Sequence, residues 1–259
     1  MAINYLNNKD MLAEIHKSKS TYCSFLTEQD QDYDIILPSV DKINIRSIAE
    51  AKRNKAKATS KRTGESIKPK NYEKQDLVFR IMTFDHIPNL ARKAKPKTIA
   101  DSKAKVNFPP FQHWRYNDQD ELICVGKSHW RDGLQNGRFS TGHGKMTNKL
   151  AKMFLLLTQR YGTRGNWRGY TYNDEMQGQA LMQLSQIGLQ FDESKSDNPF
   201  AYYTAAITNS FTRILNVEKK NQSLRDDILE ENGMMPSHTR QMEWEIQQRR
   251  EREIDEKNF

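Results

Sequence analysis

Downstream of Pro199, one face of an expected helix carries side chains of the kinds that contact nucleic acids. At positions i, i+4, i+7, i+11, i+14 and i+18, this face presents Tyr202, Ala206, Asn209, Arg213, Asn216 and Lys220. The first carboxylate in the stretch is Glu218. Aromatic rings stack on bases, amide groups hydrogen-bond to bases and sugars, and cations neutralise phosphates. The face therefore predicts a contact with nucleic acid.

Further cations flank this face in the sequence. Lys219 and Lys220 follow at the end of the basic row, and a loop upstream adds Arg160, Arg164, Trp167 and Arg168. Each phosphate that is neutralised releases counterions, so six contacts would give a slope of about −5 in log K against log salt. Arginine and tryptophan also stack on one another at protein surfaces, and the loop cluster alone leaves that alternative open.

Motifs for hydrolytic or group-transfer chemistry are absent from the sequence. It contains no Walker loop, no GxGxxG after a strand, no HExxH and no GxSxG. A metal site can be drawn on paper from Cys124, His113, His129 and His143, but their intervals match no zinc framework. We therefore expect structural or surface histidines, no metal, no cofactor and no enzymatic activity. A metal-dependent enzyme acting on nucleic acid is the alternative from another functional class.

Three helices are expected to position the polar face. Apolar residues at helical spacing predict the first over residues 147–161, with a stop at Gly162. The second begins after Asn173 as its N-cap and would expose a polar face made of Glu175, Gln179, Gln183 and Gln186. The third has Asn198 as N-cap and Pro199 at its first position. Its core side is predicted to be the stripe of Phe200, Tyr203, Ile207, Phe211 and Ile214.

The remaining segments complete a mainly α fold. Residues 4–19 predict a short amphipathic helix, and residues 51–105 are so rich in Lys and Arg that we expect a mostly extended, mobile basic insert. Two short strands are expected around the polar turn at 117–120. The predicted division is an N-terminal helix at 1–28, a largely flexible insert at 29–105, a β-hairpin module at 106–144, a compact helical domain at 145–235 and a charged helix or tail at 236–259.

Overall composition restricts the functional classes. The 259 residues carry 41 Lys and Arg against 33 Asp and Glu, a net charge of +8 that favours polyanionic partners. The longest apolar run, residues 153–157, is far below the roughly 18 residues needed to span a bilayer. The N-terminus shows no secretory signal pattern, so we expect a cytoplasmic protein in which Cys23 and Cys124 are free thiols.

The stretch FDESKSDNPFAYY at 191–203, followed by Ile207, Phe211 and Arg213, carries a family resemblance. Together with the two helices before it, it resembles the promoter-recognition core of bacterial sigma factors, in particular the late-transcription sigma factors of T-even-type and related marine bacteriophages. The sequence YLNNKDML at 5–12 is similar to the start of the phage proteins. The matching stretches cover roughly residues 4–16 and 145–230.

The resemblance implies a sigma region-2-like fold and a division of labour between helices. The polar face of the second helix (Glu175, Gln179, Gln183 and Gln186) would grip the clamp helices of the largest polymerase subunit. The exposed side of the third helix, with Tyr202, Asn209, Arg213 and Asn216, would capture and unpair an A·T-rich promoter element. The implied partners are core RNA polymerase and promoter DNA, in the cytoplasm of an infected bacterial host, with a late co-activator and the replication sliding clamp as further candidates.

The sequence departs from the family at several points. Housekeeping sigma factors have a tryptophan pair in the melting helix where this chain has residues 204–206, Thr-Ala-Ala, so Tyr202 and Tyr203 would have to supply the aromatic surface. The C-terminal residues Ile254 and Phe259 among acids are a faint counterpart of the clamp-binding tail of the phage relatives. A basic DNA-binding protein that works without polymerase therefore stays open as another alternative.

Overall fold

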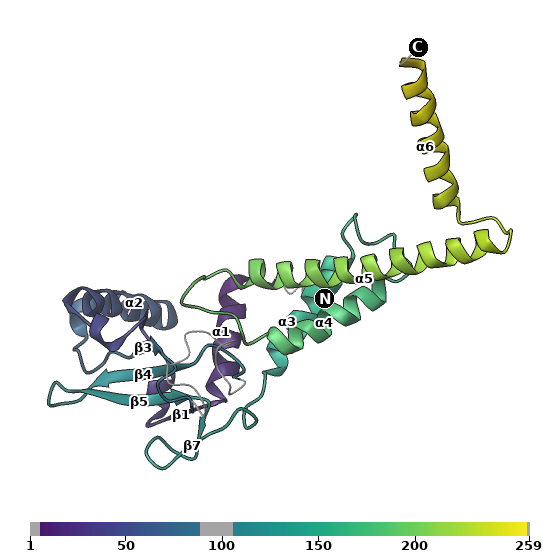
Figure 1. Cartoon of the computed structure of the whole chain (residues 1–259). Coiled ribbons are helices and arrows are strands. Elements are labelled where there is room, and N and C mark those ends of the chain that lie inside the picture. The colour runs from purple at the N-terminus through teal and green to yellow at the C-terminus, as the bar shows by residue number, and fades with distance from the viewer. Residues whose placement is uncertain (1–5, 89–105, 258–259) are drawn as a thin grey trace.

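The computed structural model describes residues 6–88 and 106–257, and this part of the chain is mainly helical, with a small mixed sheet and a β-hairpin (Figure 1). The helices are α1 (Asn8–Ser20), α2 (Ile45–Thr63), α3 (Asn148–Gly162), α4 (Asn173–Ile187), α5 (Pro199–Glu231) and α6 (His238–Lys257). The strands are β1 (Cys23–Phe25), β2 (Ile35–Leu37), β3 (Phe79–Met82), β4 (Phe111–Tyr116), β5 (Leu122–Ser128), β6 (Trp130–Arg131) and β7 (Arg138–Phe139). Over the described ranges, every helix is too short or too polar to cross a membrane.

Helices α1, α3, α4 and α5 enclose the main hydrophobic core. The predicted helix at 147–161 is α3, which is shifted by one residue, and Thr147 caps it by accepting a hydrogen bond from the Leu150 amide at 3.2 Å. Because its apolar residues recur at helical spacing, α3 presents one continuous face to the core. Phe154 on that face is 1% exposed and meets the ring of Tyr203 on α5, with centroids 4.8 Å apart.

The starts of α4 and α5 differ in how well the sequence predicts them. Asn173 is the first residue of α4 and not its N-cap. Its side-chain amide donates to the backbone oxygens of Gly162 at 3.1 Å and Trp167 at 2.9 Å, so it closes the loop between α3 and α4. The start of α5 is as predicted, because the Asn198 side chain accepts a hydrogen bond from the third residue of the helix and Pro199 occupies the first position.

A five-stranded mixed sheet lies beside the helical body, with strand order β1-β5-β4-β3-β2. β2 pairs with β3 in parallel and the other neighbours are antiparallel. The predicted pair of strands around residues 117–120 is confirmed as β4 and β5, and β6 and β7 form a separate hairpin. Cys23 and Cys124 are free thiols in the structure.

The prediction of a largely flexible insert at 29–105 is wrong as far as residue 88. This segment contains α2 and two strands of the sheet, β2 and β3. The sequence does not predict α2, because the helix buries only the small residues Ser47, Ala51 and Ala56 and so lacks a stripe of large apolar side chains. Because the partners of β3 lie in both the insert and the 106–144 module, these two predicted segments share one sheet. The predicted flexibility of 89–105 lies outside the described residues.

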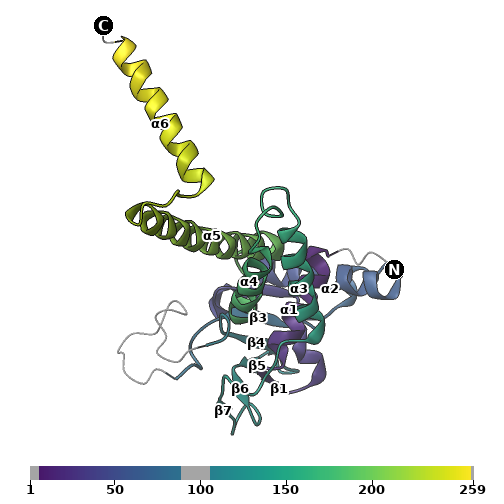
Figure 2. The ribbon, with the colours of Figure 1, turned by 90° about the vertical axis from the view of Figure 1, so that its right-hand side faces the viewer.

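The C-terminal part of the chain extends away from the core. α5 has 33 residues and continues past the helical body, and α6 projects from its far end (Figures 1 and 2). The turn between them contains Gly233 at φ +68°, a conformation that suits glycine. Asp226 fixes the turn by accepting hydrogen bonds from the Ser237 amide at 2.8 Å and from its hydroxyl at 2.7 Å.

Candidate nucleic-acid interface

α5 separates a core face from a polar outer face, as its residue spacing predicts. Tyr203, Ile207 and Phe211 are completely buried on the core face. On the outer face, a shallow groove of about 520 Å³ is lined by Asn209, Thr212, Arg213, Asn216, Val217 and Lys220. Four of the predicted contact residues, two amides and two cations, therefore share one solvent-accessible surface.

The aromatic part of the predicted surface is smaller than expected. Tyr203 was expected to face DNA, but it is 0% exposed and its hydroxyl donates to the backbone oxygen of Gly188 at 2.5 Å. Ala206, also placed in the outer row, is buried. Tyr202 is half-buried, and its ring packs against Phe191 with centroids 5.6 Å apart and against Tyr203 at 5.2 Å. One partly exposed edge of Tyr202 is the aromatic surface that remains.

Of the four residues predicted as a basic cluster here, Arg160 lies in the last turn of α3, and the loop between α3 and α4 presents two of the other three. Arg164 and Arg168 are exposed, and the Arg164 guanidinium lies 4.3 Å from the centre of the Tyr161 ring. The prediction that Trp167 contacts DNA is wrong, because its side chain is 7% exposed and packs between Tyr161 and Phe211, with centroids 6.3 and 5.4 Å away. Tryptophan at this point fills the end of the core.

Basic side chains extend the groove along α5. Lys219 and Lys220 are exposed, and Lys220 lines the groove itself. Just before them in the chain, Glu218 is half-buried and accepts a hydrogen bond from the Asn221 side chain at 3.1 Å. The residues that line the groove therefore include two cations and no carboxylate.

The polar face of α4 is separate from the groove on α5. Glu175 and Gln186 are exposed, whereas Gln179 and Gln183 are half-buried. The opposite face of α4 is fully packed, with Met176, Ala180 and Leu184 each 0% exposed. The predicted polymerase-facing residues thus lie on the side of α4 that is not used by the core.

Glu193, in the turn that leads into α5, is the centre of a buried charge network. Its Oε2 lies 3.1 Å from Lys19 Nζ on α1 and 3.3 Å from Arg80 Nη1 on β3. Lys19 also donates to the backbone oxygen of Phe191 at 2.7 Å. Burial alone would raise the pKa of the Glu193 carboxyl, but the two cations outweigh it and hold that pKa below its ordinary value. The start of α5 is thereby tied to both α1 and the sheet.

Arg80 is held by contacts on its edges and on both faces of the guanidinium. Its Nε donates to His113 Nε2 at 2.9 Å, and its Nη2 lies 3.0 Å from His16 Nδ1. The rings of Tyr33 and Phe111 sandwich the group, with centroids 3.8 and 3.9 Å from Cζ. These contacts compensate for the loss of water around a side chain that is 0% exposed.

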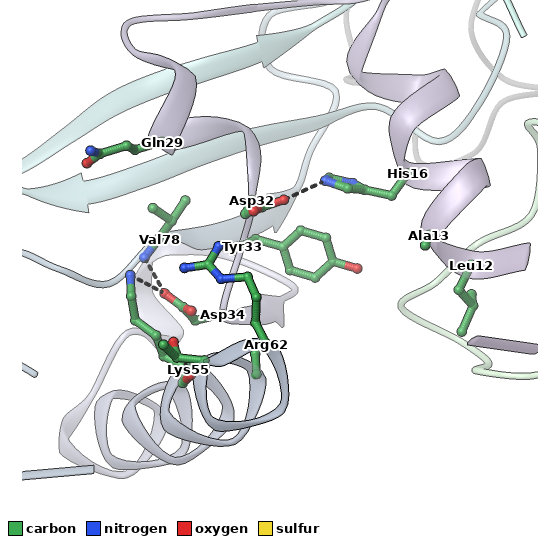
Figure 3. Close-up of a pocket in the computed structure, with 12 residues that line it drawn as sticks. Leu12, Ala13, His16, Gln29, Asp32, Tyr33, Asp34, Lys55, Arg62 and Val78 are labelled. Atoms are coloured by element: carbon green, nitrogen blue, oxygen red, sulfur yellow. Dashed lines mark hydrogen bonds and ion pairs between the residues drawn. The ribbon is translucent and has the colours of Figure 1, made fainter. Parts of the chain in front are cut away.

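A pocket of about 790 Å³ opens beside this network, between α1, α2 and the segment before β2 (Figure 3). His16 Nε2 lies 3.4 Å from Asp32 Oδ1, and Lys55 Nζ lies 3.5 Å from Asp34 Oδ2. Figure 3 shows both pairs in the wall of the pocket, with Arg62 on the α2 side. The wall carries the carboxylates of Asp32 and Asp34 and the cations of Lys55 and Arg62, so its formal charges balance, and it lacks the amide-rich row found on α5.

The histidines considered for a metal site have other roles. Both ring nitrogens of His113 are used, since Nε2 accepts from Arg80 and Nδ1 lies 2.6 Å from the backbone oxygen of Asp30. Burial lowers the pKa of His113 well below its usual value and that of His129 to about 3. His143 packs edge-on against a tyrosine ring. In residues 6–88 and 106–257, no group of three or more His, Cys, Asp or Glu side chains could hold a metal ion.

Sequence reasoning missed the charge network completely. Lys19, Arg80 and Glu193 are far apart in the chain, and each looks like an ordinary surface residue in its local context. One signal was available: Arg80 interrupts an otherwise apolar run at 77–82, and a charge in a buried strand requires partners.

Comparisons with known proteins give no further guide. No family model matches the chain, and no curated protein and no solved structure is significantly similar to it. Its function must therefore be inferred from its residues and their arrangement.

Proposed function

We propose that the chain is a sigma-type specificity subunit of bacterial RNA polymerase that directs late transcription of a phage. In this role it would bind core polymerase, recognise an A·T-rich promoter element and help to separate its strands, without catalysing a reaction itself. The proposal is supported by the family resemblance at residues 191–203 and by the polar groove on α5, which is lined by three of the four residues that the resemblance implies on this helix, Asn209, Arg213 and Asn216.

The groove is the observation that carries the proposal. Asn209 and Asn216 offer amide donors and acceptors, and Arg213 and Lys220 offer positive charge on the same surface. Amides read base edges and cations hold phosphates, so one surface combines both kinds of contact with DNA. An opened strand suits a groove of this kind, because its base edges are no longer paired.

The polar sides of α4 and α5 would act one after the other. The exposed side of α4 would dock on polymerase first, which raises the local concentration of DNA at α5. Unpairing and flipping a base costs a few kcal/mol, and base stacking returns about 1–3 kcal/mol per base. Among the rings predicted to contact DNA, Tyr202 is the one that is half-exposed, so stacking on these predicted rings would offset only part of that cost, and the polymerase or a co-activator would supply the rest.

Run-off transcription with core polymerase on templates with A·T-rich late-type promoters tests the proposal. We expect specific initiation only when the protein is present. Arg213→Ala should reduce promoter opening by about 1–3 kcal/mol, or roughly 5- to 150-fold, with polymerase binding unchanged. Arg225→Ala is the matched control, because Arg225 is exposed on the same helix and lies outside the groove. Equal effects of the two substitutions, or no initiation at all, would reject the proposal.

The role of α4 is tested by binding to polymerase. Glu175→Lys combined with Gln179→Ala should weaken capture by core polymerase in a pull-down. Glu243→Lys combined with Gln247→Ala is a matched control with the same residue types and spacing on α6, where both side chains are exposed. If the α4 variant is captured as well as the unchanged protein, the polar face of α4 faces solvent and does not bind polymerase.

Two alternatives make different predictions. A basic DNA-binding protein without polymerase is favoured by the net charge of +8, and it would bind DNA without stimulating specific initiation. A metal-dependent enzyme on nucleic acid would contain stoichiometric zinc in metal analysis, although His113 and His129 already have other partners. The proposed contact with a sliding clamp involves the C-terminal tail, where Ile254 on α6 is 58% exposed and Phe259 lies outside the described residues. A late co-activator stays a candidate partner to which no surface is assigned.

A further inference from the structure

α2 has a strong excess of positive over negative side chains. Its 19 residues include seven Lys or Arg and one Glu. α6, of similar length, has five Lys or Arg and six Asp or Glu. The two helices are both solvent-exposed along much of their length, but only α2 has a strong excess of one sign. Of these two helices, α2 is therefore the one that presents a single sign of charge.

Four cations form an exposed row on α2. Arg46, Arg53, Lys57 and Lys61 are all exposed, and at 100° per residue they lie within an arc of about 80°. In the described part of the chain, none of these four side chains has an ion-pair or hydrogen-bond partner. Lys55 differs, because it is half-buried and pairs with Asp34 at 3.5 Å.

The helix lacks the features that other partners would require. It contains no aromatic residue, so it offers no surface on which unpaired bases could stack. Its one large exposed apolar side chain is Ile45 at the first position, whereas protein interfaces and membranes need an apolar centre or face. A rigid row of cations without rings or apolar anchors fits the phosphates of a duplex, where bases are hidden and charge is dense.

The dimensions agree with this partner. From Arg46 to Lys61 the helix rises by about 22 Å at 1.5 Å per residue. A duplex of that length carries about 13 phosphate charges, one for each 1.7 Å of its axis. Glu50 shares this side of the helix, so the row has a gap in its charge between Arg46 and Arg53. The densest group of cations is Arg53, Lys57 and Lys61.

We propose that the exposed face of α2, formed by Arg46, Arg53, Lys57 and Lys61, is a second DNA-binding surface that contacts the phosphate backbone of double-stranded DNA without reading its sequence. It goes beyond the proposed function, since it concerns paired DNA and a different element from the groove on α5. It also assigns a role to the basic segment between β2 and β3.

Salt-dependent binding of the full-length protein to a short fluorescent duplex without a promoter tests this surface, with polymerase absent. The variant carries Arg53→Gln, Lys57→Gln and Lys61→Gln, which remove three charges from exposed positions. The control carries Arg249→Gln, Arg250→Gln and Arg252→Gln on α6, which remove the same charge from a helix where carboxylates alternate with cations. Circular dichroism verifies that both remain folded.

We expect the α2 variant to bind at least tenfold more weakly at about 50 mM salt, with a slope of log K against log salt that is shallower by about 2.7, or about 0.9 for each phosphate that is no longer neutralised. The α6 control should keep a slope close to that of the unchanged protein. An unaltered slope in the α2 variant, equal losses in both variants, or no duplex binding by the unchanged protein would overturn the proposal. Tighter binding to a single strand than to the duplex, abolished in the α2 variant, would also overturn it. Run-off transcription tests the sigma function separately, so failure of one leaves the other standing.

Discussion

Glu193→Gln tests whether the buried charge network stabilises the fold. The substitution keeps the shape of the side chain and removes the negative charge that Lys19 and Arg80 both contact. Lys19 is 2% exposed and Arg80 is 0% exposed, so neither cation can recover its hydration by turning outward. Removing one partner from a buried ion pair costs about 3–5 kcal/mol. This is a large part of the roughly 5–15 kcal/mol that stabilises a folded protein.

Urea denaturation followed by circular dichroism measures this loss. With an m value of about 3 kcal/mol per molar urea, the midpoint should fall by about 1–1.7 M. Glu50→Gln is the matched control, because it makes the same chemical change at an exposed residue of α2 that has no ion-pair or hydrogen-bond partner in the described part of the chain. That control should change the free energy of unfolding by less than about 1 kcal/mol.

A double substitution separates the charge effect from a packing effect. Adding Lys19→Met to Glu193→Gln removes one of the two uncompensated cations and should recover part of the stability. If Glu193→Gln costs no more than Glu50→Gln, or if the second substitution only adds to the loss, the network is not the stabilising element that its geometry indicates. The pKa of Glu193 is lowered in the folded protein, so its contribution is present above the ordinary pKa and declines as the pH falls below it.

Three further predictions concern buried groups. Tyr203→Phe leaves the Gly188 carbonyl without its hydrogen bond and should cost about 1–3 kcal/mol in urea unfolding, while the salt slope of DNA binding stays constant. Trp167→Ala should lower the free energy of unfolding by about 3–5 kcal/mol in the same measurement. A shallower slope of log K against log salt for DNA binding would instead indicate that Trp167 contacts DNA. Burial lowers the pKa of His113 and His129 in the native state. Below pH 6.5, both imidazoles therefore bind protons in the unfolded chain while they stay neutral in the native state. The free energy of unfolding should therefore decrease toward acid, by up to about 2.7 kcal/mol per pH unit for the two groups, and a flat profile from pH 7 to 5 would contradict this.

The parts of the fold that sequence predicts well are those set by local spacing. The N-cap of α5 and the core stripes of α3 and α5 follow from residues within one or two helical turns. Tyr202 and Tyr203 show the limit of the family resemblance: it places both rings at DNA, but neighbours on a helix point about 100° apart. The spacing that puts Tyr203 in line with Ile207 and Phe211 was the better guide to its burial.

What sequence could not predict depends on contacts between distant segments. α2 has little apolar surface of its own, and it is ordered because Ala51 and its neighbours pack on strands that include Phe79 of β3. Arg80 is tolerable inside the sheet because α1, β4 and the turn before α5 each supply a partner. Composition alone assigns both features to a solvated, flexible segment, since it carries no information about which residues meet in space.

The two proposed DNA surfaces differ in what they can distinguish. The α5 groove contains amides beside cations, so its contacts depend on which base edges are present. The α2 row contains cations and no rings, so it contacts phosphates that are the same in every sequence. Charge removal on α2 should therefore weaken all DNA equally, and substitutions at Asn209 or Asn216 should reduce the preference for promoter over other DNA. A protein with both surfaces can hold a duplex through α2 while α5 selects the segment to open.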